Sequence, residues 1–428
     1  MRRLSDVEPE DERAHVPLIK QLGPGLVTGA ADDDPSGIAT YSQAGAQFGY
    51  GLLWSVLFTT PLMIGIQIVS ARIGRVTGHG VAANIRERFP GPVLYCVVCL
   101  LLLANTINIA ADLGAMADAL VLVVGGNSSI YIVFFALLSL TLQIFVPFPR
   151  YAPMLKFLTL ALFAYVGTVL VVRTPPDALA QILIPKVSWN RDYVAMLVAV
   201  LGTTISPYLF FWQASQEVEE QRATPGHEPL REAPGQARAH IRRIKVDTYV
   251  GMIFSNAIAL CIMLTAAATL HAAGTSQIDS AAQAAEALRP LAGHFAFMLF
   301  AAGIIGTGLL AVPILAGSAA YAVAETFRWP IGLGLTLAEA RGFYFVVSVA
   351  TVVGVAIDLS GMDSIKALVL AAILNGVVSV PIMAILMLLA GNRRVMGTFV
   401  VGRRLKWLGW LATGVMAVAV TTMFLLMP

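Results

Sequence analysis

Charged residues are scarce in this chain: only 12% of its 428 residues are Asp, Glu, Lys or Arg, whereas 57% are hydrophobic. A soluble domain of ordinary composition carries about twice that share of charge, so the balance excludes a water-soluble globular protein. The formal net charge of +3 is also too small to indicate nucleic-acid binding. The composition therefore predicts an integral membrane protein, with the lipid bilayer as a partner and no nucleic acid.

Cysteine is nearly absent, and Cys96, Cys99 and Cys261 all fall inside apolar runs. This placement excludes a disulfide framework, and Cys96 and Cys99 have no third ligand nearby to build a zinc site. The sequence also lacks a phosphate-binding loop, a nucleotide motif and a catalytic constellation, so we predict neither an enzyme nor a cofactor. Residues 1–22 lack the apolar core of a cleaved signal peptide, which predicts a cytoplasmic N-terminal tail.

Long apolar windows are abundant. About eleven of them reach the roughly 20 residues that a helix needs to cross about 30 Å of hydrocarbon. They lie near residues 24–46, 50–74, 92–122, 128–147, 153–173, 192–217, 246–271, 293–324, 341–358, 364–391 and 406–427. We therefore predict an all-α integral membrane fold with about 11 transmembrane helices. The sequence leaves the oligomeric state open and is compatible with a monomer.

Positive charge is distributed unevenly between the connecting loops. If the N-terminus lies inside, the loops predicted to be cytoplasmic contain Arg72, Arg75, Arg86, Arg88, Arg150, Arg222, Arg231, Arg238, Arg242, Arg243, Lys245, Arg328, Arg393, Arg394, Arg403, Arg404 and Lys406. Only the connection after the fifth window, with Arg173, Lys186 and Arg191, runs against this trend. The positive-inside rule therefore predicts a multi-pass protein of the cell membrane, in bacteria the inner membrane, with a cytoplasmic N-terminus and an external C-terminus.

A polar stretch near residues 218–245 lies halfway along the chain, and its Glu, Arg, Pro and Gly are typical of a flexible linker. Each half begins with a window that proline interrupts. This pattern is typical of two inverted repeats whose first helices are discontinuous and form a site at the bilayer midplane. We expect an N-terminal tail at 1–22, a transporter domain at 23–400 with five-helix repeats near 23–175 and 190–392, and an additional C-terminal helix at 401–428.

Three consecutive carboxylates, Asp32, Asp33 and Asp34, interrupt the first window directly before Pro35. An ionised Asp at the centre of a membrane helix costs about 2.5 to 3.5 kcal/mol, so a cation or a water-filled cavity is the natural compensation. Proline disturbs the preceding turn and frees carbonyls, such as that of Ala31, to coordinate. These oxygens suit Mg²⁺, Mn²⁺ or Ca²⁺. The alternative is an interfacial turn with solvated carboxylates, which would leave the preceding segment too short to span.

The sixth window contains a second proline, in the pair Ser206-Pro207. The residue before a proline avoids helical backbone angles, so we expect Ser206 in an unwound segment, where it offers its hydroxyl while Thr203 offers a carbonyl. A single Ser-Pro pair is more often a harmless kink. Its pairing with the broken first window favours a cation site that both helices share.

Other polar residues inside the predicted helices are candidates for groups next to the site or along a proton path. These candidates are Asp33, Asp112, Tyr208, Asn256 and Asn375. Amides commonly hydrogen-bond neighbouring helices, so helix packing is the alternative role for Asn256 and Asn375. A carboxylate in a membrane bundle indicates either a proton relay or pairing with an Arg, and both remain open for Asp112.

Several motifs resemble the natural resistance-associated macrophage protein (Nramp) family of divalent metal transporters. The resemblance covers about residues 20–400 and is carried by Gly23-Pro24-Gly25 through Asp34-Pro35, Gln43 to Tyr50, Ala111-Asp112-Leu113, Leu299 to Gly303, Ala316-Gly317 and Asn392 to Gly397. It implies a LeuT-type fold of two inverted five-helix repeats, with discontinuous helices 1 and 6. That architecture agrees with the one expected from the hydropathy and the prolines.

The sequence departs from the family pattern at three motifs. In the family motif Asp-Pro-Gly-Asn, the Asp and Asn bind metal, whereas Asp34-Pro35-Ser36-Gly37 has Gly37 at the Asn position. The family's Met-Pro-His reads Ser206-Pro207-Tyr208, which replaces a thioether with a hydroxyl and a His implicated in proton movement with Tyr208. The family's Asp-Leu-Ala-Glu reads Asp112-Leu113-Gly114-Ala115, so the second acid of the proton route is missing.

These departures resemble the Nramp-related magnesium transporter branch. The resemblance implies Asp34 as central metal ligand, carbonyls from Ala31 and Thr203, Ser206 on the ion or its water, and extra room at Gly37. Loss of the soft sulfur removes a preference for Mn²⁺ over Mg²⁺. We expect uptake of hydrated Mg²⁺, with Mn²⁺ as a further substrate, by alternating access without obligatory proton coupling.

Two alternatives remain open. One is a proton-coupled Mn²⁺ or Fe²⁺ importer of Nramp type, with Asp112 as the proton acceptor. The other is an organic-solute permease of the same fold, in which the ends of the half-helices would hold a substrate carboxylate. Three adjacent aspartates would repel such an anion, which disfavours the permease.

Overall fold

The computed structural model describes residues 24–146, 159–172, 187–361 and 363–426, with a few single residues between them. The described part is helical and contains no strand. In the first half the helices are α2 (Pro24–Asp32), α3 (Pro35–Phe48), α4 (Leu53–Thr77), α5 (Val81–Arg88), α6 (Gly91–Val124), α7 (Ser128–Phe145) and α9 (Phe163–Val171).

The second half adds α11 (Arg191–Thr204), α12 (Pro207–Ala223), α13 (Ala237–Ala266), α14 (Ala281–Glu286), α15 (Arg289–Ala292), α16 (Ala296–Phe327), α17 (Arg341–Asp358), α18 (Ser364–Ala390), α19 (Arg393–Met396) and α20 (Arg403–Leu426). Each half therefore begins with a pair of short helices that a proline separates. The expected tail at 1–22 lies outside the described residues.

Nine helical segments in the described part are long and apolar enough to cross a membrane. They account for ten of the eleven expected windows, because Pro35–Thr77 runs through the first two windows as one segment. The remaining window, 153–173, falls partly outside the described residues, and the part that is described contains the shorter apolar helix Leu160–Val171. The all-α integral membrane fold is thus confirmed.

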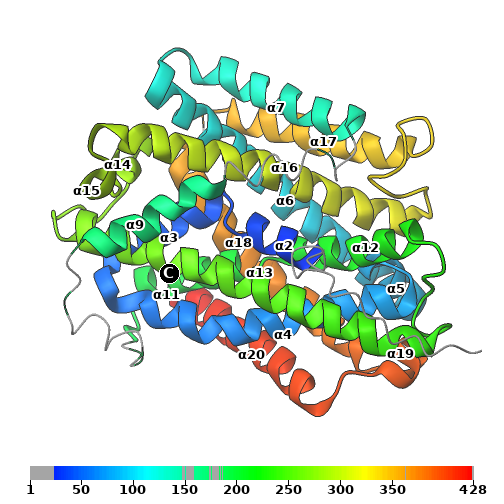
Figure 1. Cartoon of the computed structure of the whole chain (residues 1–428). Helices are drawn as coiled ribbons and strands as arrows, with labels where there is room; N and C mark the ends of the chain where they lie inside the picture. Colours follow the sequence, from blue (N-terminus) through cyan, green and yellow to red (C-terminus); the bar gives the residue numbers. More distant parts are fainter. Residues whose placement is uncertain are drawn as a thin grey trace, which may run out of the picture.

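Most of the long helices run side by side, with α14 and α15 at one end of the molecule and α5 and α19 at the other (Figure 1). The two broken helices lie inside the bundle, where α3 packs against α11, α13 and α18. The outer helices expose large apolar side chains, among them Phe134 of α7, Phe345 of α17 and Leu425 of α20. This exposed apolar surface is what a lipid-facing helix requires.

A close approach of backbones holds the broken helix α11 against α18. A Cβ atom added at Gly202 would lie only 2.1 Å from the carbonyl oxygen of Ala372 and 2.4 Å from the nitrogen of Gly376. Small residues at such crossings allow transmembrane helices to pack closely. The contact fixes the end of α11, and with it the position of Thr203.

The polar stretch at 218–245 is more ordered than its composition indicates. Helix α12 continues to Ala223 and α13 begins at Ala237, so about half of the stretch is helical. Between them, Leu230 is buried, and its N–H donates to the carbonyl of Arg75 at 3.2 Å. The composition predicts a flexible linker, but the structure docks this connection on the end of α4.

Candidate functional site

The first helix is interrupted between Asp32 and Pro35. Proline is well suited to the first position of α3, where its missing N–H has no helical partner to lose. Asp34 caps this helix: its backbone is extended, and its Oδ1 accepts from the N–H of Gly37 at 2.7 Å and the hydroxyl of Ser36 at 2.8 Å. A carboxylate is favoured at a helix N-terminus by the helix dipole, so the break itself stabilises the Asp34 side chain in place.

The sixth helix is interrupted between Thr204 and Pro207, as the sequence predicts. Ser206 has extended backbone angles, and its hydroxyl donates to the carbonyls of Gly202 and Thr203, both at 2.9 Å. The hydroxyl of Ser379 on α18 donates to the carbonyl of Ile205 at 2.7 Å. Ser206 thus uses its proton within its own segment and keeps only its oxygen lone pairs for a ligand.

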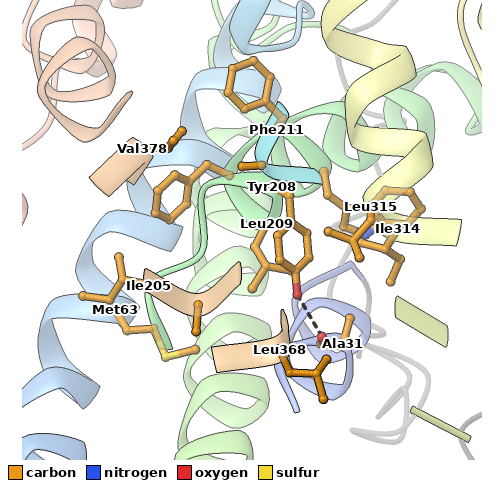
Figure 2. Close-up of a cluster of buried hydrophobic side chains, with 14 of the residues drawn as sticks. Ala31, Met63, Ile205, Tyr208, Leu209, Phe211, Ile314, Leu315, Leu368 and Val378 are labelled. Carbon is orange, nitrogen blue, oxygen red and sulfur yellow. Dashed lines mark hydrogen bonds between the residues drawn. The ribbon is translucent and has the colours of Figure 1, made fainter. Parts of the chain in front are cut away.

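Tyr208 joins the two breaks. Its hydroxyl lies 3.1 Å from the carbonyl oxygen of Ala31 and 3.3 Å from Oδ2 of Asp34, and it donates toward both. Figure 2 shows the ring among apolar side chains, including Leu209 and Leu315, with its hydroxyl pointing at Ala31. The structure therefore brings together Ala31, Asp34 and Tyr208, three of the residues that the sequence singles out.

Gly37 faces the space between the two breaks. A Cβ atom at this position would lie 3.3 Å from Oγ1 of Thr203, 3.4 Å from Oδ1 of Asp34 and 3.2 Å from the carbonyl oxygen of Asp32. These distances lie at or below the lower limit of ordinary van der Waals contact, so a larger residue at position 37 would press against these oxygens. The group of Thr203 closest to position 37 is its hydroxyl, whereas its carbonyl accepts from Ser206.

The other two carboxylates of the triplet face α13. The Ser255 hydroxyl lies 2.7 Å from Oδ2 of Asp32 and 3.2 Å from Oδ1 of Asp33, and both carboxylates are buried. One hydroxyl carries one proton and satisfies one acceptor at a time. Within the part of the chain that the structure describes, no three His, Cys, Asp or Glu side chains are grouped to hold a metal ion. A cation here would rely on carbonyls, hydroxyls and its own water.

Asp112 lies on α6, beside the first break. It is fully buried, and no side chain among the described residues hydrogen-bonds its carboxylate. The charge of Asp34 and the backbone N–H of Ser36 are among its electrostatic neighbours. No Arg or Lys of the described residues pairs with it, so the pairing with a basic residue is not found there.

The two candidate amides take part in helix packing. The Asn256 amide donates to the carbonyl of Met252 at 3.1 Å within α13, and its nitrogen also lies 2.9 Å from the sulfur of Met63. Asn375 on α18 accepts from the amide of Asn108 on α6 at 2.9 Å. These contacts fit the packing role, and a role in proton movement stays a prediction.

A comparison with models of protein families shows to which family this chain belongs. The family model of natural resistance-associated macrophage protein-like transporters matches residues 25–426. The chain belongs to the Nramp family. It is therefore a multi-pass membrane transporter from a family of divalent metal transporters, and not an enzyme.

Two bacterial relatives named divalent metal cation transporter MntH match nearly the whole chain. The protein from Yersinia enterocolitica is 28% identical over 96% of this chain and 95% of its own length. The protein from Pectobacterium carotovorum is 27% identical over 91% of this chain and 90% of its own length. The similarity extends beyond the region where motifs were apparent and includes most of the C-terminal helix.

Solved structures confirm the LeuT-type fold. The crystal structure of the Eremococcus coleocola manganese transporter matches with a TM-score of 0.72 at 18% identity, over 98% of this chain and 91% of that one. Mhp1, a nucleobase-cation-symport-1 family transporter in a closed conformation, matches with a TM-score of 0.57 at 14% identity, over 95% and 92% of the two chains. At these identities the likeness establishes architecture alone.

The departures of this Nramp chain from the family motifs gather at the two breaks. Gly37 lines the space between them, Ser206 lies in the second break, and Tyr208 contacts the first. Ala115 is buried on α6, one turn beyond Asp112. The substitutions thus change the composition of one site and its surroundings.

Two further contacts at the site of this Nramp chain escape motif analysis. The Tyr41 hydroxyl pairs with that of Thr204 at 2.9 Å, which ties α3 to the end of α11. The Thr28 hydroxyl donates to the side-chain carbonyl of Gln213 at 2.5 Å and ties α2 to α12. All four residues are buried in the structure. In the sequence they are polar residues inside apolar windows, and this is the one signal that could have indicated them.

Proposed function

We propose that this Nramp protein imports divalent metal cations and that Mg²⁺, carried with part of its water shell, is its main substrate, with Mn²⁺ as a second. The observation that carries the proposal is the donor set between the breaks. Asp34 supplies a carboxylate, Ala31 and Thr203 supply carbonyls, and Ser206 supplies a hydroxyl oxygen. All four donors are hard oxygens, which suit Mg²⁺ and Mn²⁺ and give no advantage to softer metals.

The absence of a side-chain ligand at position 37 supports a hydrated ion. Gly37 supplies no side-chain donor beside Asp34 and Thr203, and Asp34 is the one charged member of the proposed donor set. A cation with so few protein ligands must complete its coordination with water. Mg²⁺ dehydrates reluctantly and usually keeps several waters in proteins, so it matches this site.

The breaks also supply the moving parts of the proposed transport cycle. Residues 33–34 and 205–206 lie between the half-helices, where the regular helical hydrogen-bond pattern is interrupted. Rocking of one repeat against the other around such breaks gives alternating access to a fixed site. The Tyr208 hydroxyl would exchange part of its contact with Asp34 for the ion or its water when a cation binds.

We propose that the membrane potential drives this import without obligatory proton coupling. The potential supplies about 2.3 kcal/mol per charge per 100 mV. Tyr208 and Ala115 replace the two titratable residues of the family's proton route. The second candidate is a proton-coupled Mn²⁺ importer, and the buried Asp112 favours it, because a carboxylate without a basic partner among the described residues would accept a proton.

The proposed topology has the N-terminus inside, the C-terminus outside, and repeats near 23–175 and 190–392. It is supported by the basic residues of α5 and α19, Arg86, Arg88, Arg393 and Arg394, because these helices lie at the same end of the molecule (Figure 1). The positive-inside rule assigns that end to the cytoplasm. The opposite end, with α14 and α15, then faces outside.

Reconstituted vesicles test the proposed function and its rival together. Under an inside-negative potential, we expect the wild-type protein to accumulate Mg²⁺ while a lumenal pH indicator stays constant. The rival predicts Mn²⁺ uptake that acidifies the lumen, because each cation would enter with a proton. Absence of Mg²⁺ uptake, or acidification of the lumen in proportion to Mg²⁺ uptake, would contradict the proposal. Protein-free vesicles under the same potential report the leak.

A further inference from the structure

A second acidic region lies at the end of the molecule that carries α14. A cavity of about 570 Å³ opens there between the ends of α6 and α17 and the start of α18. Its lining includes four carboxylates and no basic residue among those that the structure describes; the four are Asp118, Asp279, Asp358 and Asp363. Under the proposed topology, this cavity faces the outside.

Three of these carboxylates have partners. Asp363 caps α18, and its Oδ2 lies 3.1 Å from Nζ of Lys366, which also lies 3.8 Å from Oδ1 of Asp279. Asp118 accepts a hydrogen bond from the hydroxyl of Ser128 at 2.8 Å. Contacts of this kind stabilise exposed carboxylates and do not by themselves indicate a ligand.

Asp358 differs from the other three. It is only 7% exposed although it lines the cavity, and within the described residues its carboxylate has no hydrogen bond and no ion pair. The one charge that acts on it is that of Asp118, which repels it. Among the described residues no basic group offsets the charge of Asp358, and a cation in the cavity would offset the charges of both carboxylates.

A glycine on α6 admits the Asp358 carboxylate. A Cβ atom at Gly114 would lie 2.3 Å from Oδ1 of Asp358 and 2.8 Å from the hydroxyl oxygen of Ser364. Even an alanine at position 114 would therefore displace the carboxylate. The sequence thus provides both the buried acid on α17 and the space on α6 that receives it.

A smaller cavity adjoins the acidic cavity on the side of α3. Asp118, together with Ala281 and Ile365, also lines this smaller cavity, whose other walls include Ile38 and Ser42 of α3. Helix α3 begins directly after Asp34. The smaller cavity, of about 10 Å³, thus shares walls both with the acidic cavity and with the helix that follows Asp34.

We infer that Asp358 and Asp118 form an entry site that holds a hydrated divalent cation through its water shell before the ion moves to Asp34; this inference rests on the proposed function. Contact through water follows from the side-chain placement, because the described residues contain no group of three acidic, His or Cys side chains suited to direct coordination. Carboxylates in a cleft raise the local concentration of cations and their association rate, by about 10- to 1,000-fold in strong cases.

Uptake kinetics of Asp358→Asn test the entry site. The amide keeps the size of the carboxylate and so still fits over Gly114. We expect the apparent KM for Mg²⁺ to rise about tenfold at low ionic strength with an unchanged maximal rate, and the difference to shrink in high salt because screening weakens steering. Asp118→Asn should also raise the apparent KM for Mg²⁺. It keeps the entry site testable if Asp358→Asn fails to fold.

The matched control is Glu232→Gln, which removes one exposed negative charge near the cytoplasmic end and should leave the KM unchanged. If Asp358→Asn and Asp118→Asn both match the wild type at every Mg²⁺ concentration, the entry site is overturned while the proposed function stands. If the wild type carries no Mg²⁺, the proposed function fails instead.

A binding measurement separates the entry site from the central site. In the Asp34→Asn variant, we expect Mn²⁺ to bind weakly with a fully hydrated electron paramagnetic resonance spectrum. Adding Asp358→Asn should abolish this residual binding. Binding that is equal in the single and the double variant would contradict the entry site, whatever the transport rates are.

Discussion

Replacing Asp34 with Asn is expected to lower Mg²⁺ uptake by at least about 100-fold, because a charged metal ligand should matter more than the neighbouring groups whose loss typically costs 10- to 100-fold. The fold should persist, since Asn caps a helix about as well as Asp, and its side-chain oxygen still accepts from the N–H of Gly37. The loss would therefore report the missing negative charge. Initial rates of Mg²⁺ uptake in reconstituted vesicles measure it.

Asp192→Asn is the matched control, because Asp192 lies exposed in the first turn of α11 and takes no part in the site. It should transport at the wild-type rate. Melting temperatures in detergent should agree among the wild type and both variants. Wild-type uptake by Asp34→Asn would refute the assignment of Asp34 as the central ligand.

Restoring the family's ligands should change the selectivity. In Gly37→Asn combined with Ser206→Met, an amide would occupy the space beside Asp34, and a thioether would replace the hydroxyl. Both changes favour an ion that sheds water and accepts a softer ligand, so we expect the ratio of Mn²⁺ to Mg²⁺ uptake to rise about tenfold or more. Parallel uptake measurements with each ion give the ratio.

Two single variants separate the causes of this shift. Gly37→Ala narrows the space without adding a ligand, because its Cβ would lie 3.2 to 3.4 Å from the neighbouring oxygens. It should slow Mg²⁺ uptake without favouring Mn²⁺. Ser206→Met alone adds the sulfur and removes the hydroxyl contacts with Gly202 and Thr203. An unchanged ratio in the double variant would show that these donors do not set the selectivity.

The fold and the two helix breaks could be predicted because their signals are local. Apolar windows mark the helices, and the prolines at 35 and 207 mark the two breaks whatever the remaining structure does. A buried carboxylate next to such a break, as at Asp34, is explained most simply by a cation site. Each of these inferences needs only neighbouring residues in the chain.

The contacts between segments could not be predicted in this way. The Tyr208 hydroxyl reaches the carbonyl of Ala31 because the packing of the bundle places α12 against α2. Likewise, the burial of Leu230 depends on α4. Composition alone predicts that residues 218–245 are flexible. Composition contains no information about the end of α4 on which this segment docks.

The same limit applies to the acidic cavity that Asp118 and Asp358 line. Asp358 and Gly114 are more than 200 residues apart in the sequence and unremarkable there, and only the packing of α17 against α6 brings them into contact. A single sequence indicates that an acid ends an apolar window. It does not indicate which helix receives that acid or whether a counter-charge is present.

Competition between Mg²⁺ and Mn²⁺ tests the central claim most directly, that the broken helices form a site for a hard, partly hydrated ion. Vesicles with the wild-type protein take up a trace of Mn²⁺ while external Mg²⁺ is raised, and uptake of both ions is recorded. We predict that Mg²⁺ inhibits Mn²⁺ uptake at concentrations similar to those at which Mg²⁺ itself is carried. Mn²⁺ uptake that persists unchanged in a large excess of Mg²⁺ would contradict this prediction.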